Sequence, residues 1–114
     1  MAGNQRTGRR GEDAAAEWYR RRGFTVLDRN WRVRQGELDL ICEQAGLVVF
    51  CEVKTRTGGR FGRGIEAVGH AKQRRIRQLA VRWLSGRGGG FADLRFDVAE
   101  VDAAGRVEVW EGCF

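Results

Sequence analysis

The fold is decided by residues 37–55, which read ELDLICEQAGLVVFCEVKT. Two runs with β-strand character, 37–43 and 47–55, flank the short connection 44–46. Gly46 in that connection can adopt the backbone angles that a tight turn requires. The pattern therefore predicts a β-hairpin in the middle of the chain.

The register of this hairpin decides which side chains share a face of the sheet. If residues 45–46 form a two-residue turn, counting outward along the ladder places Asp39 directly opposite Glu52. Directly opposed side chains have Cβ atoms roughly 5 Å apart. A shift of one residue would send the two carboxylates to opposite faces, so the interpretation depends on the turn.

Two carboxylates in this position predict a metal site. Like charges directly opposed on a sheet are destabilising, whereas a divalent cation bound by both would make the pair favourable, and Mg²⁺ prefers such oxygen ligands. Lys54 lies on the same face as Glu52 because strand side chains alternate, and Glu37 would face Lys54. The alternative is a structural ion-paired cluster, since a lysine beside two carboxylates needs no metal.

Helical and strand patterns alternate around the hairpin. Apolar residues at helical spacing predict a helix over residues 9–22, and Gly23 follows it as a left-handed cap. A crossover through a later helix should join two strands, so the predicted class is α/β (α+β): a central mixed sheet flanked by helices, in the order α-β-β-β-α-β-β. The remaining predicted elements are strands at 24–27 and 31–34, a helical region from residue 65 in two pieces around Gly69, and strands at 94–101 and 106–110.

The length of 114 residues predicts one domain spanning residues 1–114. Residues 1–8 are expected to be flexible. Four glycines and three arginines within residues 55–64 predict a mobile basic loop at 56–64.

The composition favours a polyanionic partner. The net charge is +6, the sequence pI is about 10.2, and the basic residues are 19 arginines and 2 lysines. This balance attracts nucleic acid electrostatically, although codon bias toward arginine would give the same count.

The apolar and sulfur-containing residues predict a location in the cytoplasm. The longest apolar stretch, residues 46–51, is far shorter than the roughly 20 residues that span a bilayer, and the basic N-terminus has no apolar signal core. Cys42, Cys51 and Cys113 lack the spacing of a zinc site and are expected to be reduced packing residues. We therefore expect a cytoplasmic protein with no membrane partner.

The sequence resembles a nuclease superfamily. GELDLI at 36–41 and FCEVKTR at 50–56 resemble the PD-(D/E)xK nucleases, especially their Holliday-junction-resolvase and RecB-nuclease-like branches. Nearly the whole chain also resembles the YraN-like family of small bacterial proteins, through GRRGEDAA at 8–15, RNWR at 29–32, EAV at 66–68 followed by Lys72, and RFDV at 95–98.

This resemblance implies a restriction-endonuclease-like fold and assigns roles to named residues. It makes Asp39 and Glu52 metal ligands and Lys54 the catalytic lysine, and it matches Glu12 to an acid on the N-terminal helix that completes the metal site. Related resolvases commonly act as dimers on two-fold symmetric substrates, so a homodimer is a further expectation.

Basic residues outside this cluster are candidates for contacts with nucleic acid. A solvated helix face or a plain loop would show the same pattern of charges. The candidates are Arg32, Arg34, Arg56, Arg60, Arg63, Lys72 and Arg75.

The predicted activity is hydrolysis of phosphodiester bonds in structured or branched DNA by a metal-dependent endonuclease. Mg²⁺ or Mn²⁺ held by Asp39 and Glu52 would polarise the phosphoryl oxygen and acidify water, while Lys54 would orient the attacking hydroxide or stabilise negative charge. The alternative is a catalytically silent nucleic-acid-binding or repair-associated adaptor on the same scaffold. A purely structural partner protein is a third possibility.

Overall fold

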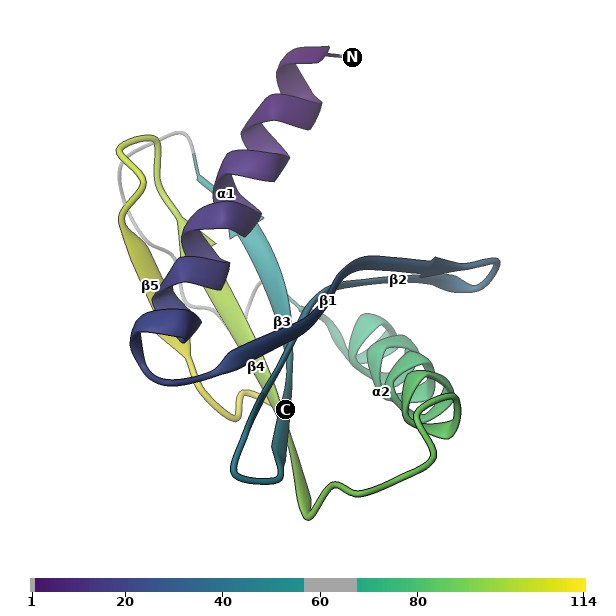
Figure 1. The fold of residues 1–114 in the computed structure, drawn as a ribbon. Coiled ribbons are helices and arrows are strands. Elements are labelled where there is room, and N and C mark those ends of the chain that lie inside the picture. Colours follow the sequence, from purple (N-terminus) through teal and green to yellow (C-terminus); the bar gives the residue numbers. More distant parts are fainter. Residues whose placement is uncertain (1, 57–67) are drawn as a thin grey trace.

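The order of helices and strands agrees with the sequence prediction over the residues that the structure describes (Figure 1). The computed structural model describes residues 2–56 and 68–114, and the side chains of residues 9–56 and 68–114. The predicted order α-β-β-β-α-β-β is confirmed. The elements are α1 (Ala2–Arg21), β1 (Thr25–Val33), β2 (Gly36–Gln44), β3 (Leu47–Thr55), α2 (His70–Ser85), β4 (Asp93–Val101) and β5 (Val107–Trp110).

The strands form one mixed sheet in the order β1-β2-β3-β4-β5. β3 and β4 run parallel, and the other neighbouring strands are antiparallel. A parallel pair needs a crossover connection, and α2 lies within it. The chain therefore has the mixed α+β architecture predicted for a restriction-endonuclease-like fold.

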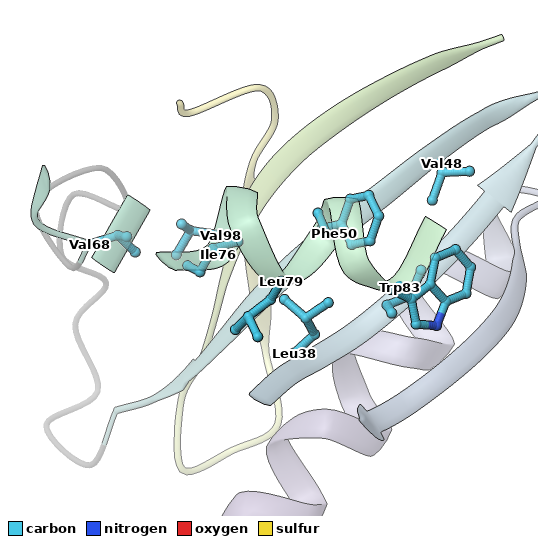
Figure 2. Packing of buried hydrophobic residues seen from close by; sticks show 10 residues of the cluster. Leu38, Val48, Phe50, Val68, Ile76, Leu79, Trp83 and Val98 are labelled. Atoms are coloured by element: carbon cyan, nitrogen blue, oxygen red, sulfur yellow. The ribbon is translucent and has the colours of Figure 1, made fainter. Parts of the chain in front are cut away.

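The two helices cover opposite faces of this sheet. Val48 and Phe50 of β3 pack beneath α2 in one buried cluster with Trp83 (Figure 2). Val49, which lies between them, packs in a second cluster with Tyr19 of α1. Because side chains alternate along a strand, the two clusters lie on the two faces of the sheet.

The first strand differs from the prediction. The strand patterns at residues 24–27 and 31–34, which the predicted order counts as one strand, are separated by residues 28–30, whereas β1 runs unbroken through those residues and pairs with β2 along nearly its whole length. The register shifts between Val26 and Asp28, and Asn30 has a positive φ of 52°. A bulge lets a strand absorb an extra residue without ending, and Asn tolerates left-handed backbone angles better than most residues.

The ends of both helices also differ from the prediction. α1 begins at Ala2, although the helix was expected to start at residue 9; no proline interrupts the N-terminal residues, so the helix can propagate outward. α2 starts directly after Gly69, and the helical piece expected before Gly69 falls largely outside the described residues. The predicted loop at 56–64 lies outside them too, apart from Arg56. Neither helix is long and apolar enough to cross a membrane.

A buried polar network joins α1 to the centre of the sheet. The Tyr19 hydroxyl donates a hydrogen bond of 2.6 Å to Asp97 of β4, and both side chains are fully buried. Asp97 also accepts two hydrogen bonds from the Arg95 guanidinium and one from the Gly112 N–H. Burial, followed by the nearby Cys51 and Asp97, raises the pKa of Tyr19, so its hydroxyl stays protonated and remains a donor. This network fixes α1 against the sheet.

We predict that Tyr19→Phe lowers the free energy of unfolding by about 2 kcal/mol, because the buried Asp97 carboxylate loses one of its donors. Denaturant unfolding checks this value. A double-mutant cycle with Asp97→Asn should show a coupling energy of about 1 kcal/mol or more. Additive effects would show that the hydroxyl acts independently of the carboxylate.

Candidate functional site

The β2–β3 hairpin has the predicted register. Its turn residues Ala45 and Gly46 have φ values of 50° and 86°, as in the two-residue turns that favour positive φ. The ladder runs from Gln44↔Leu47 to Leu40↔Cys51, where it ends. From there the β1–β2 ribbon bends away from β3 toward α2 (Figure 1). The next pair in the same register would be Asp39 and Glu52, at the fork between the strands.

Asp39 is fixed at this fork by the backbone of β3. Its Oδ2 accepts a hydrogen bond of 2.9 Å from the Val53 N–H. A side-chain carboxylate thus takes the place of the backbone carbonyl that a continued ladder would have supplied. This hydrogen bond orients Asp39 and engages only one of its two carboxylate oxygens.

Glu52 meets a lysine from α2. Its side chain is almost buried, with 5% of the residue exposed, and its Oε1 lies 3.3 Å from the Nζ of Lys72 in the first turn of the helix. Glu52 and Lys54 continue the alternation of Phe50, which packs beneath α2, so both point to the same side of the sheet. The charged cluster therefore lies on the same side of the sheet as the apolar core beneath α2, at one end of that core.

These side chains line one pocket of about 390 Å³ between β2, β3 and α2. Two other hollows, of about 380 and 540 Å³, lie on other parts of the described surface. Neither is lined by a lysine, whereas both lysines of the chain line the first pocket. The lining residues are Gly36, Glu37, Asp39, Glu52, Val53, Lys54, Lys72, Arg75, Ile76 and Leu79.

Burial and a neighbouring carboxylate disfavour the charge of Asp39. Burial and the nearby Glu52 raise the pKa of Asp39 to about 7, against the opposing effect of the Val53 N–H. Burial also raises the pKa of Glu52, although Lys72 and Lys54 act in the opposite direction. A cation placed between the carboxylates would remove this penalty.

The two lysines also influence each other's charge. A hydrogen bond with Lys72, followed by burial, lowers the pKa of Lys54. Burial lowers the pKa of Lys72, but its contacts with Lys54 and with the Glu52 carboxylate outweigh burial and raise it above the ordinary value. Lys72 is therefore the lysine that holds its positive charge more firmly.

Glu12, the third expected metal ligand, has another partner. Its Oε1 accepts a hydrogen bond of 2.8 Å from the Asn30 side chain of β1. Its charge still contributes to the raised pKa of Asp39, so the two acids lie within electrostatic reach. Within residues 2–56 and 68–114, no three His, Cys, Asp or Glu side chains come together closely enough to hold a metal ion. Glu12 as a ligand stays a prediction.

Glu37 and Arg32 form an ion pair across the β1–β2 ribbon, with Arg32 Nε 2.7 Å from Glu37 Oε2. The sequence placed Glu37 opposite Lys54, but the strands have separated at that point. Glu37 and Lys54 line the same pocket without pairing in the ladder.

The fold leaves some of the candidate nucleic-acid contacts exposed and engages others in ion pairs. Arg34 is exposed at the end of the β1–β2 ribbon, and Arg75 is exposed at the pocket. Arg56 forms an ion pair with the fully buried Glu100, whose Oε2 lies 3.0 Å from the Arg56 Nε. Arg60 and Arg63 lie outside the described residues.

The ion pair between Lys72 and Glu52 is the main feature that sequence reasoning did not find. The sequence offers Lys72 as a phosphate contact on a helix face and, in the family resemblance, after the string EAV at 66–68, with no link to Glu52. Its position beside Glu52 results from how α2 packs on the sheet, which no local pattern encodes. One signal was present: lysine is rare in this chain, and the two lysines are Lys54 and Lys72.

The family comparison covers most of the chain. The model of the family described as "Uncharacterised protein family UPF0102" matches residues 11–101. A UPF0102 protein of Rhodococcus jostii is 48% identical over 101 residues, which cover 89% of this chain and 86% of that protein. A UPF0102 protein of Parafrankia sp. is 46% identical over 118 residues and is covered in full, as is this chain. A third, from Anaeromyxobacter dehalogenans, is 45% identical over 98% of this chain and 86% of its own length.

We predict that Asp39→Asn stabilises the metal-free protein at high pH. The pKa of Asp39 is about 7 in the folded state and ordinarily 3.8, so the unfolded chain loses this proton first and stability falls as pH rises from about 4 to about 7. Asn removes that loss. In EDTA at pH 8 the variant should gain about 1–2 kcal/mol, below the unscreened limit of about 4 kcal/mol.

Denaturant unfolding of both proteins between pH 4 and pH 8 measures this difference. The gain should shrink toward zero near pH 4. Glu108→Gln, on an exposed residue of β5, controls for the loss of one surface charge. A variant less stable than the wild type at pH 8 would show that the folded state does not disfavour the charge of Asp39.

Proposed function

We propose that this chain, which belongs to the family UPF0102, the YraN-like family, is a divalent-metal-dependent endonuclease that hydrolyses phosphodiester bonds in structured or branched DNA. The observation that carries this proposal is the convergence of Asp39, Glu52 and Lys54 on one pocket. The resemblance of the surrounding strings to PD-(D/E)xK nucleases supports the same reaction class.

The residues fit a small divalent cation. Mg²⁺ is commonly bound by one or two carboxylates together with water and substrate phosphates, so a third protein ligand is not required. Asp39 and Glu52 supply two oxygen donors, and burial together with the neighbouring Glu52 raises the pKa of Asp39. The pocket that they share has room for water and a phosphate group, at about 390 Å³. Mn²⁺ suits the same donors.

Asp39 and Glu52 would hold the metal ion, which when bound polarises the phosphoryl group and makes water more acidic. The Val53 N–H keeps the Asp39 carboxylate oriented toward the pocket. Lys54 presents its ammonium from the same sheet face, where it can orient the attacking water and donate a hydrogen bond to a phosphate oxygen as negative charge develops. The packed core beneath α2 keeps these groups in place.

Basic side chains at the pocket favour a polyanionic substrate. Arg75 lines the pocket, and Arg34 is exposed at the end of the ribbon that forms one of its walls. The net charge of +6 adds a long-range attraction for nucleic acid. Phosphate contacts of this kind position a substrate without reading its sequence.

One observation favours a binding protein without turnover. Lys72 already balances the charge of Glu52 at 3.3 Å, so the cluster can be satisfied as an ion-paired structure. On this second proposal the scaffold binds nucleic acid and no reaction follows. Cleavage assays separate the two proposals.

We predict that the wild-type protein cuts labelled four-way-junction, flapped or linear DNA with Mg²⁺ or Mn²⁺. Asp39→Ala, Glu52→Ala and Lys54→Ala should each lower the rate on the order of 100-fold or more, because each removes a ligand or a charge that acts on the reacting phosphate. Gel assays over the three substrates measure the rates.

Glu108→Ala, an acid on β5 outside the pocket, is the matched control and should cut at the wild-type rate. Cutting that persists in all three site variants would place the activity elsewhere. Binding without cutting by the wild type, over all substrates and both metals, would favour the silent adaptor.

We predict that Arg34→Met and Arg75→Met weaken DNA binding mainly at low salt. Each lost phosphate contact should reduce the slope of log K against log [salt] by about 1. Fluorescence anisotropy at several salt concentrations measures this slope in the absence of metal. Arg21→Met on α1, where Arg21 pairs with Glu17, is the control. An unchanged slope in both site variants would exclude these arginines from the interface.

A further inference from the structure

Lysine is used selectively in this protein. Of 21 basic residues, 19 are arginines, and the two lysines, Lys54 and Lys72, both line the pocket that holds Asp39 and Glu52. An ammonium is a compact charge on a flexible chain, whereas a guanidinium binds carboxylates through a rigid fork. Beside Arg75, the pocket therefore contains both copies of the more mobile and less tightly held type of cation.

The other buried acids show the contrast. Within the described residues, four charged side chains are buried: Glu52, Asp97, Glu100 and Asp102. The last three are paired with arginines, at 2.9, 3.0 and 2.7 Å. Only Glu52 is paired with a lysine, and at 3.3 Å this is the longest of the four ion pairs.

The exposure of the two partners is unequal. The Glu52 side chain is 6% exposed and the Lys72 side chain is 41% exposed. A carboxylate that is nearly buried stays charged only beside a counter-charge, because an unpaired buried charge is costly. Lys72 reaches water, as do Arg56 and Arg106, but its ammonium holds the carboxylate without a rigid guanidinium fork, so it can withdraw once another cation takes its place.

We propose that Lys72 is a displaceable counter-cation of the metal site: it neutralises Glu52 before a divalent ion binds, releases Glu52 when the ion arrives, and then offers its ammonium to a phosphate of the bound nucleic acid. This inference rests on the proposed metal centre. It assigns Lys72 a role that a fixed ion pair would not have, because Lys72 and the metal ion compete for the same carboxylate.

The test is the affinity for Mn²⁺ in the full-length wild type, Lys72→Met and Lys72→Arg, measured without nucleic acid by electron paramagnetic resonance of free Mn²⁺. Lys72→Met removes the competitor, so its dissociation constant should fall at least roughly fivefold, the lower end of typical coupling between two ligands. Lys72→Arg supplies a guanidinium fork that holds Glu52 more firmly, so its dissociation constant should rise. Circular dichroism confirms folding.

Arg74→Met is the matched control, because Arg74 is an exposed cation on the same helix that does not line the pocket. It should leave Mn²⁺ affinity within about twofold of the wild type, since screened surface charges contribute little. A gain in Arg74→Met equal to that in Lys72→Met would mean that only net charge matters, and would overturn the proposal.

The remaining outcomes separate this inference from the proposed function. Wild-type binding that is unchanged or weaker in Lys72→Met would leave the metal centre standing and reject the role of Lys72. No Mn²⁺ binding by the wild type or by Lys72→Met would reject both. Labelling with an amine-reactive acetylating reagent gives a second readout, because the chain has only two lysines: Mn²⁺ should increase modification of Lys72 in the wild type.

Discussion

Asp39 and Glu52 repel each other at the fork where β2 leaves β3, and the main contacts of the pocket partly offset that repulsion. The Val53 N–H binds one carboxylate and Lys72 binds the other. These contacts lower the cost of the pair without removing it, since burial and Glu52 still raise the pKa of Asp39 to about 7. A protein that needed only a stable sheet would gain from replacing Asp39, whose charge the folded state disfavours. The strain is explained if the site is completed by a divalent cation.

The rest of the fold holds this fork rigid. α1 and α2 pack on opposite faces of β3, so the strand that carries Glu52 and Lys54 is covered on both sides. The Tyr19–Asp97 hydrogen bond fixes α1 to β4, the parallel neighbour of β3. α2 begins next to the pocket and brings Lys72 to it in its first turn. Rigid elements therefore position the charged groups, and the more exposed Lys72 is the one placed to move.

The sequence predicts the features that depend on local pattern. The turn at residues 45–46 sets the register, and strand alternation then places Glu52 and Lys54 on one face. The point at which β2 and β3 separate was not predictable in this way, because it depends on how the β1–β2 ribbon bends toward α2. For the same reason the ion pair of Lys72 with Glu52 and the hydrogen bond of Asn30 with Glu12 were missed. Each joins side chains of two different elements, and the packing of those elements on one another is not encoded by a local pattern.

Anomalous diffraction from crystals of the protein soaked in Mn²⁺ tests the central claim most directly. The account predicts an anomalous peak between the carboxylates of Asp39 and Glu52, at about 2.2 Å from their oxygens as expected for a small divalent ion, with the Lys72 ammonium moved away from Glu52. A pocket without a peak at saturating Mn²⁺, with Lys72 still bound to Glu52, would show that the cluster is a structural ion pair and that the protein is not a metal-dependent nuclease of this kind.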